Sequence, residues 1–441
     1  MTKYFRVVFE EYDSQPTADN KNNVVLEGKI AAPTNCLDFG VRHDDQMKLI
    51  SSIQDKILSL QVSEIKPTGD KCPRCDEGIL KKHGFLASWF YDVFSDHRVK
   101  LPRRRCNKCK HVDSGSVQKL LGNSLSGELI KIQSELGAQY SYRDSENLIN
   151  QYSNKKRRIN NHEKIHATSE QVGESLSNLH QIEDEVLSSE DAKELIVHVD
   201  GGHIKSVEED HRSFEVMTSA IYQPNALKTN GKRTRNYIEN KQCAASAMAD
   251  SQEQMKRRTI IAALKQGINS KTKVTALCDG AENCWNIINA LEPISGSIDR
   301  ILDWFHLSMK IQNIALPEEI KPKLLRIKWH LWRGNTDRAT QRIVELIPLC
   351  SDKSADRLQQ LKKYIEHNAS KIINYRERQK RKLPFTSHLA ESTVESLINQ
   401  RCKGQKHMRW SREGLDPILQ IRAAIASRDW QQNWKTVITS I

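Results

Sequence analysis

The sequence predicts a multidomain α/β protein in which a mixed β-sheet core is interrupted by an all-helical insertion. Between residues 195 and 302, short apolar runs with a period of two alternate with amphipathic helical stretches, as in a sheet covered by helices. Residues 306–383 then show helical periodicity and almost no strand signal. With 441 residues, the chain has room for about three domains of ordinary size.

The composition favours folded cores with a polar surface and a polyanionic partner. Hydrophobic residues make up 38% and charged residues 28% of the chain, and its longest apolar runs fall far short of the ~20 residues of a membrane-spanning helix. The run 4–9 contains charge, so it predicts a strand and not a signal peptide. The net charge of +13 indicates nucleic acid as the partner, although a solvated basic surface would give the same composition.

Four cysteines are spaced as two metal-binding knuckles. Cys72 and Cys75 form one Cys-x-x-Cys pair, and Cys106 and Cys109 form the other. Each pair offers two thiolates to one tetrahedral ion, which predicts a closed, structural Zn²⁺ site without an open position for water. Because a redox Cys-x-x-Cys needs only one pair, the repeated spacing favours a zinc ribbon over thiol chemistry or four incidental thiols.

Two basic clusters are expected to contact phosphate. One lies on the second knuckle, and the other lies in residues 154–161, between helical stretches over 126–149 and 162–177. That layout is consistent with a helix-turn-helix, and a solvated basic face is the alternative for both clusters. The predicted DNA-binding residues of these clusters are Arg103, Arg104, Arg105, Lys155, Lys156, Arg157 and Arg158.

The core is predicted as three strands, a helix, a strand, a helix and a strand. In this order the first and fourth strands should lie side by side. The expected elements are strands over 195–199, 203–207 and 214–222, a helix over 244–267, a strand over 274–278, a helix over 281–291 and a strand over 298–302.

Two aspartates follow apolar strands of this core and precede glycine. We expect Asp200 and Asp279 to emerge at strand ends, where a substrate can approach, and to lie close together on the neighbouring first and fourth strands. Two close carboxylates repel unless one is protonated or a cation lies between them. Oxygen ligands without thiolate or imidazole suit Mg²⁺ or Mn²⁺.

Three blocks of the core carry a resemblance to a known family. Residues 279–285 and 303–306 are similar to the second-aspartate block and the Asp-x-x-His of ISKra-type insertion-sequence transposases, which have a DDE triad on an RNase H-like core. Residues 391–394, together with Arg401 and Trp410, are similar to the glutamate helix of that family. The matching blocks lie within residues 195–427, and the zinc ribbon and helix-turn-helix are similar in a less specific way.

The resemblance implies a DNA transposase that cleaves and joins strands at the terminal repeats of an insertion sequence. Its catalytic and metal-binding triad would be Asp200, Asp279 and Glu391, holding two Mg²⁺ or Mn²⁺ ions. One ion would activate water or a 3′-hydroxyl, and the other would stabilise the leaving oxygen. The partners would be terminal inverted repeats and target DNA, both double-stranded, with the zinc ribbon and helix-turn-helix recognising the repeats.

Several assignments keep an alternative. Glu395 lies four residues after Glu391 on the same helix face, and the ten-residue interval to Arg401 favours Glu391. His306 is either a helix-cap or core histidine or an auxiliary group near the reacting phosphate. Arg401 and Lys403 are expected to contact DNA. The alternative function is a zinc-dependent DNA-binding regulator with an inactive core, and a third is a nuclease that acts on structured RNA.

Pairing two DNA ends implies a homo-oligomer on DNA, and the resemblance implies a bacterial cytoplasmic protein at the nucleoid, with no membrane partner. Changes in composition and periodicity give the expected segments. They are an N-terminal hairpin and helix over 1–66, the zinc ribbon over 67–115, the helix-turn-helix over 116–177, a linker over 178–193, the first part of the core over 194–305, the helical insertion over 306–385 and the last part of the core over 386–441.

Overall fold

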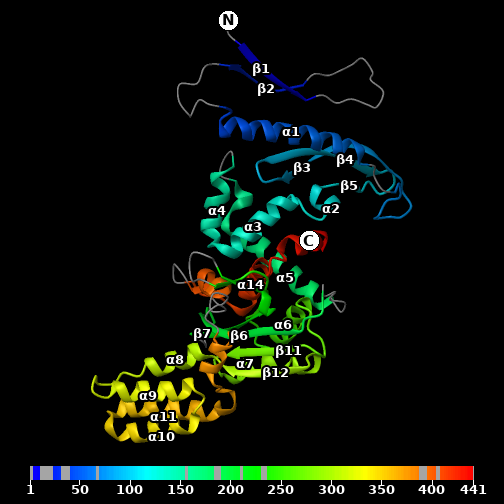
Figure 1. Ribbon diagram of the computed structural model, residues 1–441. Coiled ribbons are helices and arrows are strands. Elements are labelled where there is room, and N and C mark those ends of the chain that lie inside the picture. Colours follow the sequence, from blue (N-terminus) through cyan, green and yellow to red (C-terminus); the bar gives the residue numbers. More distant parts are fainter. Residues whose placement is uncertain are drawn as a thin grey trace. The chain divides into compact units, whose positions relative to one another are not determined.

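The structure is a computed structural model, and the chain in it separates into two units, Met1–Ser169 and Glu170–Ser440 (Figure 1). No helix among the described residues is long and apolar enough to cross a membrane. Of the predicted site residues, Lys155, Lys156 and Glu391 lie outside the described residues. The structure describes residues 3–9, 23–30, 40–65, 69–153, 157–182, 190–208, 212–229, 236–386, 395–403 and 408–440.

The first unit contains two antiparallel sheets. Strands β1 (Lys3–Phe9) and β2 (Asn23–Ile30) form a hairpin. Strands β3 (Leu80–Tyr91), β4 (Asp96–Cys106) and β5 (Val112–Ser114) form a three-stranded sheet in that order. Helix α1 (His43–Glu64) packs its apolar residues against one face of this second sheet, where Val99 and Leu101 are buried.

Four further helices follow in this unit. They are α2 (Val117–Leu121), α3 (Gly127–Gln139), α4 (Tyr142–Gln151) and the beginning of α5 (His162–Ile182). The hydroxyls of Ser126 and Ser141 accept hydrogen bonds from the first turns of α3 and α4, so serine caps fix where both helices begin.

His97 of β4 is buried beneath α1 between two carboxylates. Its Nδ1 lies 2.7 Å from Oδ1 of Asp55 on α1, and its Nε2 lies 3.1 Å from Oδ2 of Asp92. Burial lowers the pKa of His97, but the two carboxylates outweigh burial and raise this pKa above its usual value. Burial likewise raises the pKa of Asp92, and hydrogen bonds from His97 and from two backbone N–H groups bring it below its usual value.

This pair predicts a defined pH window of stability. Because the pKa of His97 is raised, its interactions with the two carboxylates stabilise the folded state fully below pH ~6.5. This stabilisation is lost as the pH rises through the folded pKa of His97. Because the pKa of Asp92 is lowered, its hydrogen bonds stabilise the folded state above pH ~4. This stabilisation is lost as the pH falls through the folded pKa of Asp92. His97→Gln should therefore lower the free energy of unfolding by about 2–3 kcal/mol at pH 6, and by less at pH 9. Urea denaturation across this range measures it, with the exposed His43→Gln as control; equal curves for the wild type and His97→Gln would contradict the pairing.

The second unit is built on a mixed five-stranded sheet, which confirms the predicted fold class. Strands β6, β7 and β10 run antiparallel, and β11 and β12 run parallel to β6, in the order β10-β7-β6-β11-β12. The first and fourth predicted strands, now within β6 and β11, are neighbours as expected. The bounds are β6 (Glu194–Lys205), β7 (Ser213–Tyr222), β10 (Gln242–Ser246), β11 (Lys273–Cys278) and β12 (Ser297–Leu302), with a small hairpin of β8 (Leu227–Thr229) and β9 (Asn236–Ile238).

Two of the predicted elements were wrong. Strand β6 runs unbroken through Gly201 and Gly202, so 203–207 is not a separate strand and Asp200 lies inside β6, not at its end. A Cβ at Gly201 would lie 2.8 Å from the carboxylate of Glu215 on β7, so this glycine serves close strand packing and does not end the strand. The third strand of the sheet is β10, whose last three residues lie in the stretch predicted as helix over 244–267. Its alanines, cysteine and serine carry no β-branched signal.

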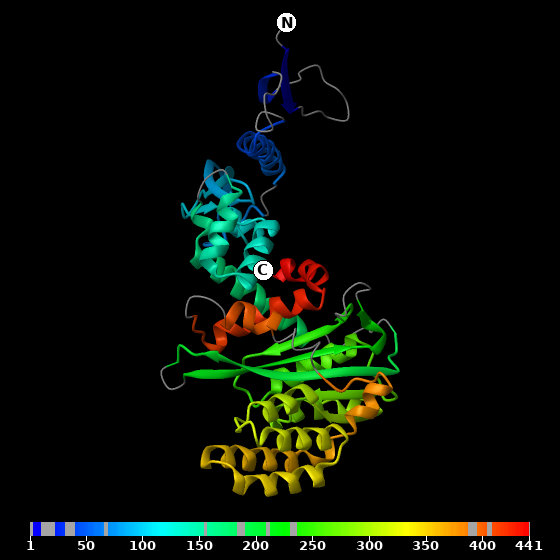
Figure 2. The ribbon, with the colours of Figure 1, turned by 60° about the vertical axis from the view of Figure 1, so that its left-hand side comes forward.

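Helices cover both faces of this sheet (Figure 2). Helices α6 (Glu253–Lys265) and α7 (Glu282–Asn289) bury their apolar residues against one face. The predicted helical insertion packs on the other, and its core is continuous with Ile196, Leu277 and Leu302 of the sheet. The insertion consists of α8 (Trp304–Gln312), α9 (Lys321–Trp332), α10 (Thr336–Leu346), α11 (Asp352–His367) and α12 (Tyr375–Lys380).

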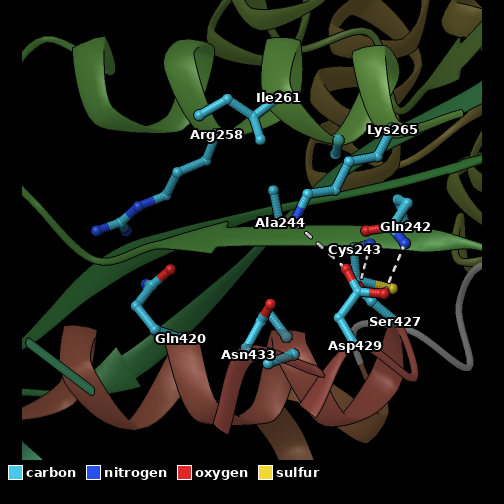
Figure 3. Close-up of a pocket in the computed structure, with 13 residues that line it drawn as sticks. Gln242, Cys243, Ala244, Arg258, Ile261, Lys265, Gln420, Ser427, Asp429 and Asn433 are labelled. Atoms are coloured by element: carbon cyan, nitrogen blue, oxygen red, sulfur yellow. Dashed lines mark hydrogen bonds and ion pairs between the residues drawn. The ribbon is translucent and has the colours of Figure 1, made fainter. Parts of the chain in front are cut away.

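The chain returns to the sheet after the insertion. A π-helix (Glu395–Lys403) is followed by α14 (Arg412–Ala426) and α15 (Trp430–Ser440). Helices α14 and α6 meet at β10, where they enclose a cavity of only about 20 Å³, roughly the room of one water molecule (Figure 3). Arg258 and Gln420 line this cavity, which is too small to hold a substrate.

A buried ion pair joins the same two helices. The guanidinium of Arg258 donates two parallel hydrogen bonds, of 2.9 and 2.8 Å, to the carboxylate of Asp416, and both residues are buried. Arg258→Met should lower the free energy of unfolding of the second unit by about 3–5 kcal/mol, because it leaves the buried carboxylate of Asp416 without its cationic partner. Thermal unfolding measures the loss. The double variant Arg258→Met/Asp416→Leu should recover part of it, and a double variant as unstable as the single one would contradict this account.

Candidate active site

The two predicted aspartates lie on neighbouring strands. In the parallel register of β6 and β11, His198 pairs with Leu277. Asp200 and Asp279 each lie two residues further along, so they are level with each other on strands about 4.8 Å apart. The structure thus brings these two predicted residues together, although Asp200 belongs to the interior of β6.

Two further side chains join the aspartates. Nε2 of His306 on α8 lies 4.0 Å from Oδ2 of Asp200 and 3.6 Å from Oδ2 of Asp303. Burial raises the pKa of Asp200; His306 and the N–H of Gly201 lower it, while the carboxylates of Asp279 and Asp303 raise it further, and the net shift is upward. A site where neighbouring carboxylates raise the pKa of Asp200 is one that a cation would stabilise, and its oxygen ligands suit Mg²⁺ or Mn²⁺.

Local hydrogen bonds hold Asp279 in place. Its Oδ1 accepts a 2.9 Å hydrogen bond from the N–H of Ala281, which forms a turn before α7. The hydroxyl of Tyr364 on α11 donates to the backbone carbonyl of Asp279. Gly280 has φ +89°, and a Cβ there would lie 2.6 Å from a methyl of Leu302. Glycine after Asp279 is therefore required by backbone conformation and by space.

Sequence reasoning did not include Asp303 and Tyr364 among the site residues. Asp303 is fully buried and caps α8 by accepting a 3.0 Å hydrogen bond from the N–H of Phe305. It follows strand β12, just as Asp279 follows β11, so the same strand-end signal could have found it. Tyr364 lies 85 residues after Asp279 in an amphipathic helix, where no sequence signal marks it.

The π-helix that begins at Glu395 lies on β6. A Cβ at Gly202 would lie 3.3 Å from Ile398 and 3.4 Å from Nζ of Lys403, so the π-helix crosses β6 two residues from Asp200. Arg422 of α14 fixes this helix by donating a 2.8 Å hydrogen bond to the carbonyl of Leu397. Because Glu391 lies outside the described residues, only its alternative can be located here. The exposed carboxylate of Glu395 accepts a 2.8 Å hydrogen bond from the amide of Asn399.

The four predicted cysteines converge in the first unit. Their sulfur atoms all lie within 4.8 Å of one another, with 3.6 Å between Cys72 and Cys109 and 3.7 Å between Cys75 and Cys106. A tetrahedron of ~2.3 Å zinc–sulfur bonds has edges of about 3.8 Å, so the geometry fits Zn²⁺. Gly78 makes room for the cluster, because a Cβ there would lie 2.2 Å from the sulfur of Cys106.

The electrostatics of the cluster favour metal binding. Hydrogen bonds from the N–H groups of Glu77 and Gly78 lower the pKa of Cys75 to about 6. Thiolates are the zinc-binding form of cysteine, so this thiol loses its proton most readily as the ion binds. The four-cysteine cluster is consistent with a structural zinc site.

A second group of possible soft ligands lies beside the aspartates. Among the described residues, Cys278, Asp279 and Cys284 also have ligand atoms within 4.8 Å of one another. A hydrogen bond with Cys278, together with burial, raises the pKa of Cys284 far above its usual value. Both cysteines are buried and pack in the apolar core, so we assign them to packing.

The predicted DNA-binding residues of the knuckle face differ in their surroundings. Arg103 donates a 3.2 Å hydrogen bond to the carbonyl of His83, and Arg104 forms a 3.0 Å ion pair with Asp113. Arg105 is exposed on β4.

The residues predicted in the later clusters also divide into buried and exposed. Arg157 is buried and donates to Asp96 and to three backbone carbonyls, so it holds the β3–β4 turn to the segment after α4. Arg401 is buried, with its guanidinium 4.8 Å from the ring centroid of Trp410. Arg158 and Lys403 are exposed and accessible to a phosphate.

Comparison with known proteins gives little beyond this geometry. No protein-family model matches the chain, and no curated protein matches it. Among solved structures, the chain is similar to the Drosophila P element transposase strand transfer complex, with 9% identity over 70% of this chain and 81% of that chain. The TM-score of 0.24 is too low to support a conclusion, so the fold assignment rests on the sheet and the cysteine cluster.

Proposed function

We propose that this protein is a DDE-type DNA transposase, related to the ISKra-type family, which cleaves and joins DNA strands at terminal repeats. The observation that carries the proposal is the level placement of Asp200 and Asp279 on neighbouring parallel strands, with Asp303 and His306 in the same charged cluster. Carboxylates gathered on one mixed sheet, in a chain of net charge +13, suit metal-dependent chemistry on a polyanion.

The residues of the site divide into proposed metal ligands and residues that position them. Asp200 and Asp279 hold the divalent ions, and Glu391 completes the triad, with Glu395 as the alternative. When bound, a pair of Mg²⁺ ions supplies activation of water or of a 3′-hydroxyl and charge stabilisation of the leaving oxygen. His306 orients the carboxylate of Asp200, and Tyr364 fixes the backbone of Asp279.

The basic surfaces of the two units serve the DNA. Exposed Arg105 and Arg158 belong to the modules proposed to recognise the terminal repeats. Near the acids, Lys310 and Arg357 line a hollow of about 300 Å³ on the insertion, and Tyr364 joins that hollow to Asp279. These cations suit the phosphates that flank the reacting bond. We also propose that the protein pairs DNA ends as a homo-oligomer at the bacterial nucleoid.

An end-cleavage assay tests the function. The purified protein is incubated with Mg²⁺ and linear DNA that carries the sequences flanking its own coding region. We expect cleavage at the boundary of an inverted repeat, a free 3′-hydroxyl and joining of that end to a second duplex. Duplex binding without cleavage in Mg²⁺ or Mn²⁺ would instead support the regulator with an inactive core. Preferential cleavage of RNA–DNA hybrids would support the nuclease.

A further inference from the structure

The outward face of the β3–β4 ribbon in the first unit exposes large aromatic side chains. Phe85 is 58% and Trp89 is 49% exposed. With Tyr91 they occupy alternate positions of β3, so their side chains lie on one face of the sheet. The rings of Trp89 and Tyr91 are nearly parallel, with centroids 6.4 Å apart and an interplanar angle of 14°.

This face is not the core face of the sheet. Leu101 and Val99 of β4 point to the opposite face, where they are buried against α1 and α2. Burial of β4 alternates strictly from His97 to Leu101, so the two faces differ in kind. The exposed aromatic residues therefore have no role in folding that the described structure shows, and they are too large and too close together to count as scattered surface residues.

The same face carries a row of cations on the neighbouring strand. Arg98 pairs with Trp89 in the strand register, and Lys100 pairs with Ala87, so their side chains project on the aromatic side. Both are exposed, and among the described residues no acidic side chain pairs with either. A third cation, Lys82, has its Nζ 5.5 Å from the ring centroid of Phe85.

We propose that this face binds single-stranded nucleic acid, with bases stacked on Phe85 and Trp89 and phosphates at Arg98 and Lys100. Stacking platforms next to a row of cations are how proteins hold unpaired strands without sequence preference. The positive charge of the face favours a polyanion. Asp96, the acidic residue that pairs with Tyr91 in the strand register, does not cancel this charge, because it already forms a 2.7 Å ion pair with Arg157. Paired bases expose no free ring faces to such a platform, so the face should prefer unpaired strands.

The decisive test exchanges aromatic character while keeping apolar bulk. Phe85→Leu/Trp89→Leu should weaken binding of the full-length zinc-loaded protein to a fluorescein-labelled 20-nucleotide single strand by at least tenfold, since stacking contributes ~1–3 kcal/mol per base. Phe85→Tyr/Trp89→Phe should bind within about twofold of wild type. Fluorescence anisotropy without Mg²⁺ reads both, and the matching 20-base-pair duplex should bind all three proteins alike.

Charge variants test the phosphate contacts separately. Arg98→Gln/Lys100→Gln should weaken single-strand binding and reduce the salt slope of log K by roughly 1.4, which corresponds to two phosphate contacts. The control Lys48→Gln/Lys56→Gln on α1 lowers the net charge by the same two units and should leave the slope unchanged. Trp329→Ser removes a tryptophan of α9 that is 59% exposed, and it controls for non-specific aromatic contact.

A direct measurement on the unmodified protein covers the case in which a variant misfolds. A single strand containing 5-iodouracil, crosslinked by ultraviolet light, should attach to the tryptic peptide of residues 83–98. Crosslinks confined to other peptides would overturn the proposal. The proposal would also be overturned if Phe85→Leu/Trp89→Leu kept its full zinc content and bound the single strand as tightly as wild type, since base stacking would then contribute nothing to binding. Because the assays contain no Mg²⁺, they are independent of the proposed chemistry at Asp279.

Discussion

Asp279→Asn is expected to reduce Mg²⁺-dependent strand cleavage by on the order of 10³-fold or more, a loss of about 4 kcal/mol of transition-state stabilisation. The amide keeps the hydrogen bond from Ala281 but loses the charge that a hard divalent cation needs. Single-turnover cleavage of a repeat-containing duplex at saturating protein measures the effect. Duplex binding should stay unchanged, because the substitution leaves in place the cations of both units that are proposed to contact the DNA.

The same substitution should not destabilise the folded protein, although it is expected to reduce cleavage. The folded pKa of Asp200 is raised, so the folded state loses stability as the pH rises from the unfolded pKa through the folded one. Removing the charge of Asp279 relieves part of this repulsion. Without divalent ions at pH 7, the free energy of unfolding should stay equal or rise by up to about 1 kcal/mol.

A matched control removes another aspartate of the same sheet. Asp299 lies on β12 in an exposed 3.2 Å ion pair with Lys273. Asp299→Asn should leave cleavage unchanged and alter stability by less than about 0.5 kcal/mol. Cleavage by Asp279→Asn at the rate of this control would refute the assignment of Asp279.

Cys72→Ser is expected to release the metal and unfold the zinc-ribbon part of the first unit. Structural zinc contributes apparent free energies of about 10–16 kcal/mol in small domains, comparable with the whole stability of a typical domain. The zinc content should fall from one ion per chain to none, and amide protons of β3 and β4 should lose protection in hydrogen exchange. Duplex affinity should fall with it, while protection of the sheet in the second unit persists.

Cys350→Ser provides the control for this experiment. Cys350 is half-buried in the helical insertion, where its thiol donates to the carbonyl of Leu346, and it belongs to no cysteine cluster among the described residues. This variant should keep full zinc content. A Cys72→Ser protein with stoichiometric zinc and unchanged protection of β4 would show that the cysteines do not hold a structural ion.

The sequence predicted those features that local periodicity or fixed spacing encodes. The paired Cys-x-x-Cys, the apolar runs of β11 and β12 and the strand-poor stretch 306–383 each carry such a signal, and each is present in the structure. The neighbouring placement of β6 and β11 also followed, because only a few strand orders fit this succession of elements. Asp279 emerges after its strand as expected.

The features that were missed depend on tertiary contacts. Gly201 and Gly202 usually mark a turn, but here the neighbouring Glu215 and Ile398 leave no room for larger side chains, and β6 continues through both glycines. The alanine-rich β10 forms a strand because β7 and the helices at its side bury it. Tyr364 reaches Asp279 only through the packing of α11. Arg157 lies in a basic run of the sequence, which predicts a surface cation, but its guanidinium is buried against the β3–β4 turn.

Anomalous diffraction from crystals grown with Mn²⁺ tests the central claim most directly. The account predicts two peaks about 3.5–4 Å apart that contact the carboxylates of Asp200 and Asp279, with Glu391 or Glu395 as the third ligand. The contrary result is an absence of manganese at these two aspartates, or both glutamates lying more than about 15 Å from them, since two ions ~4 Å apart cannot bridge that distance.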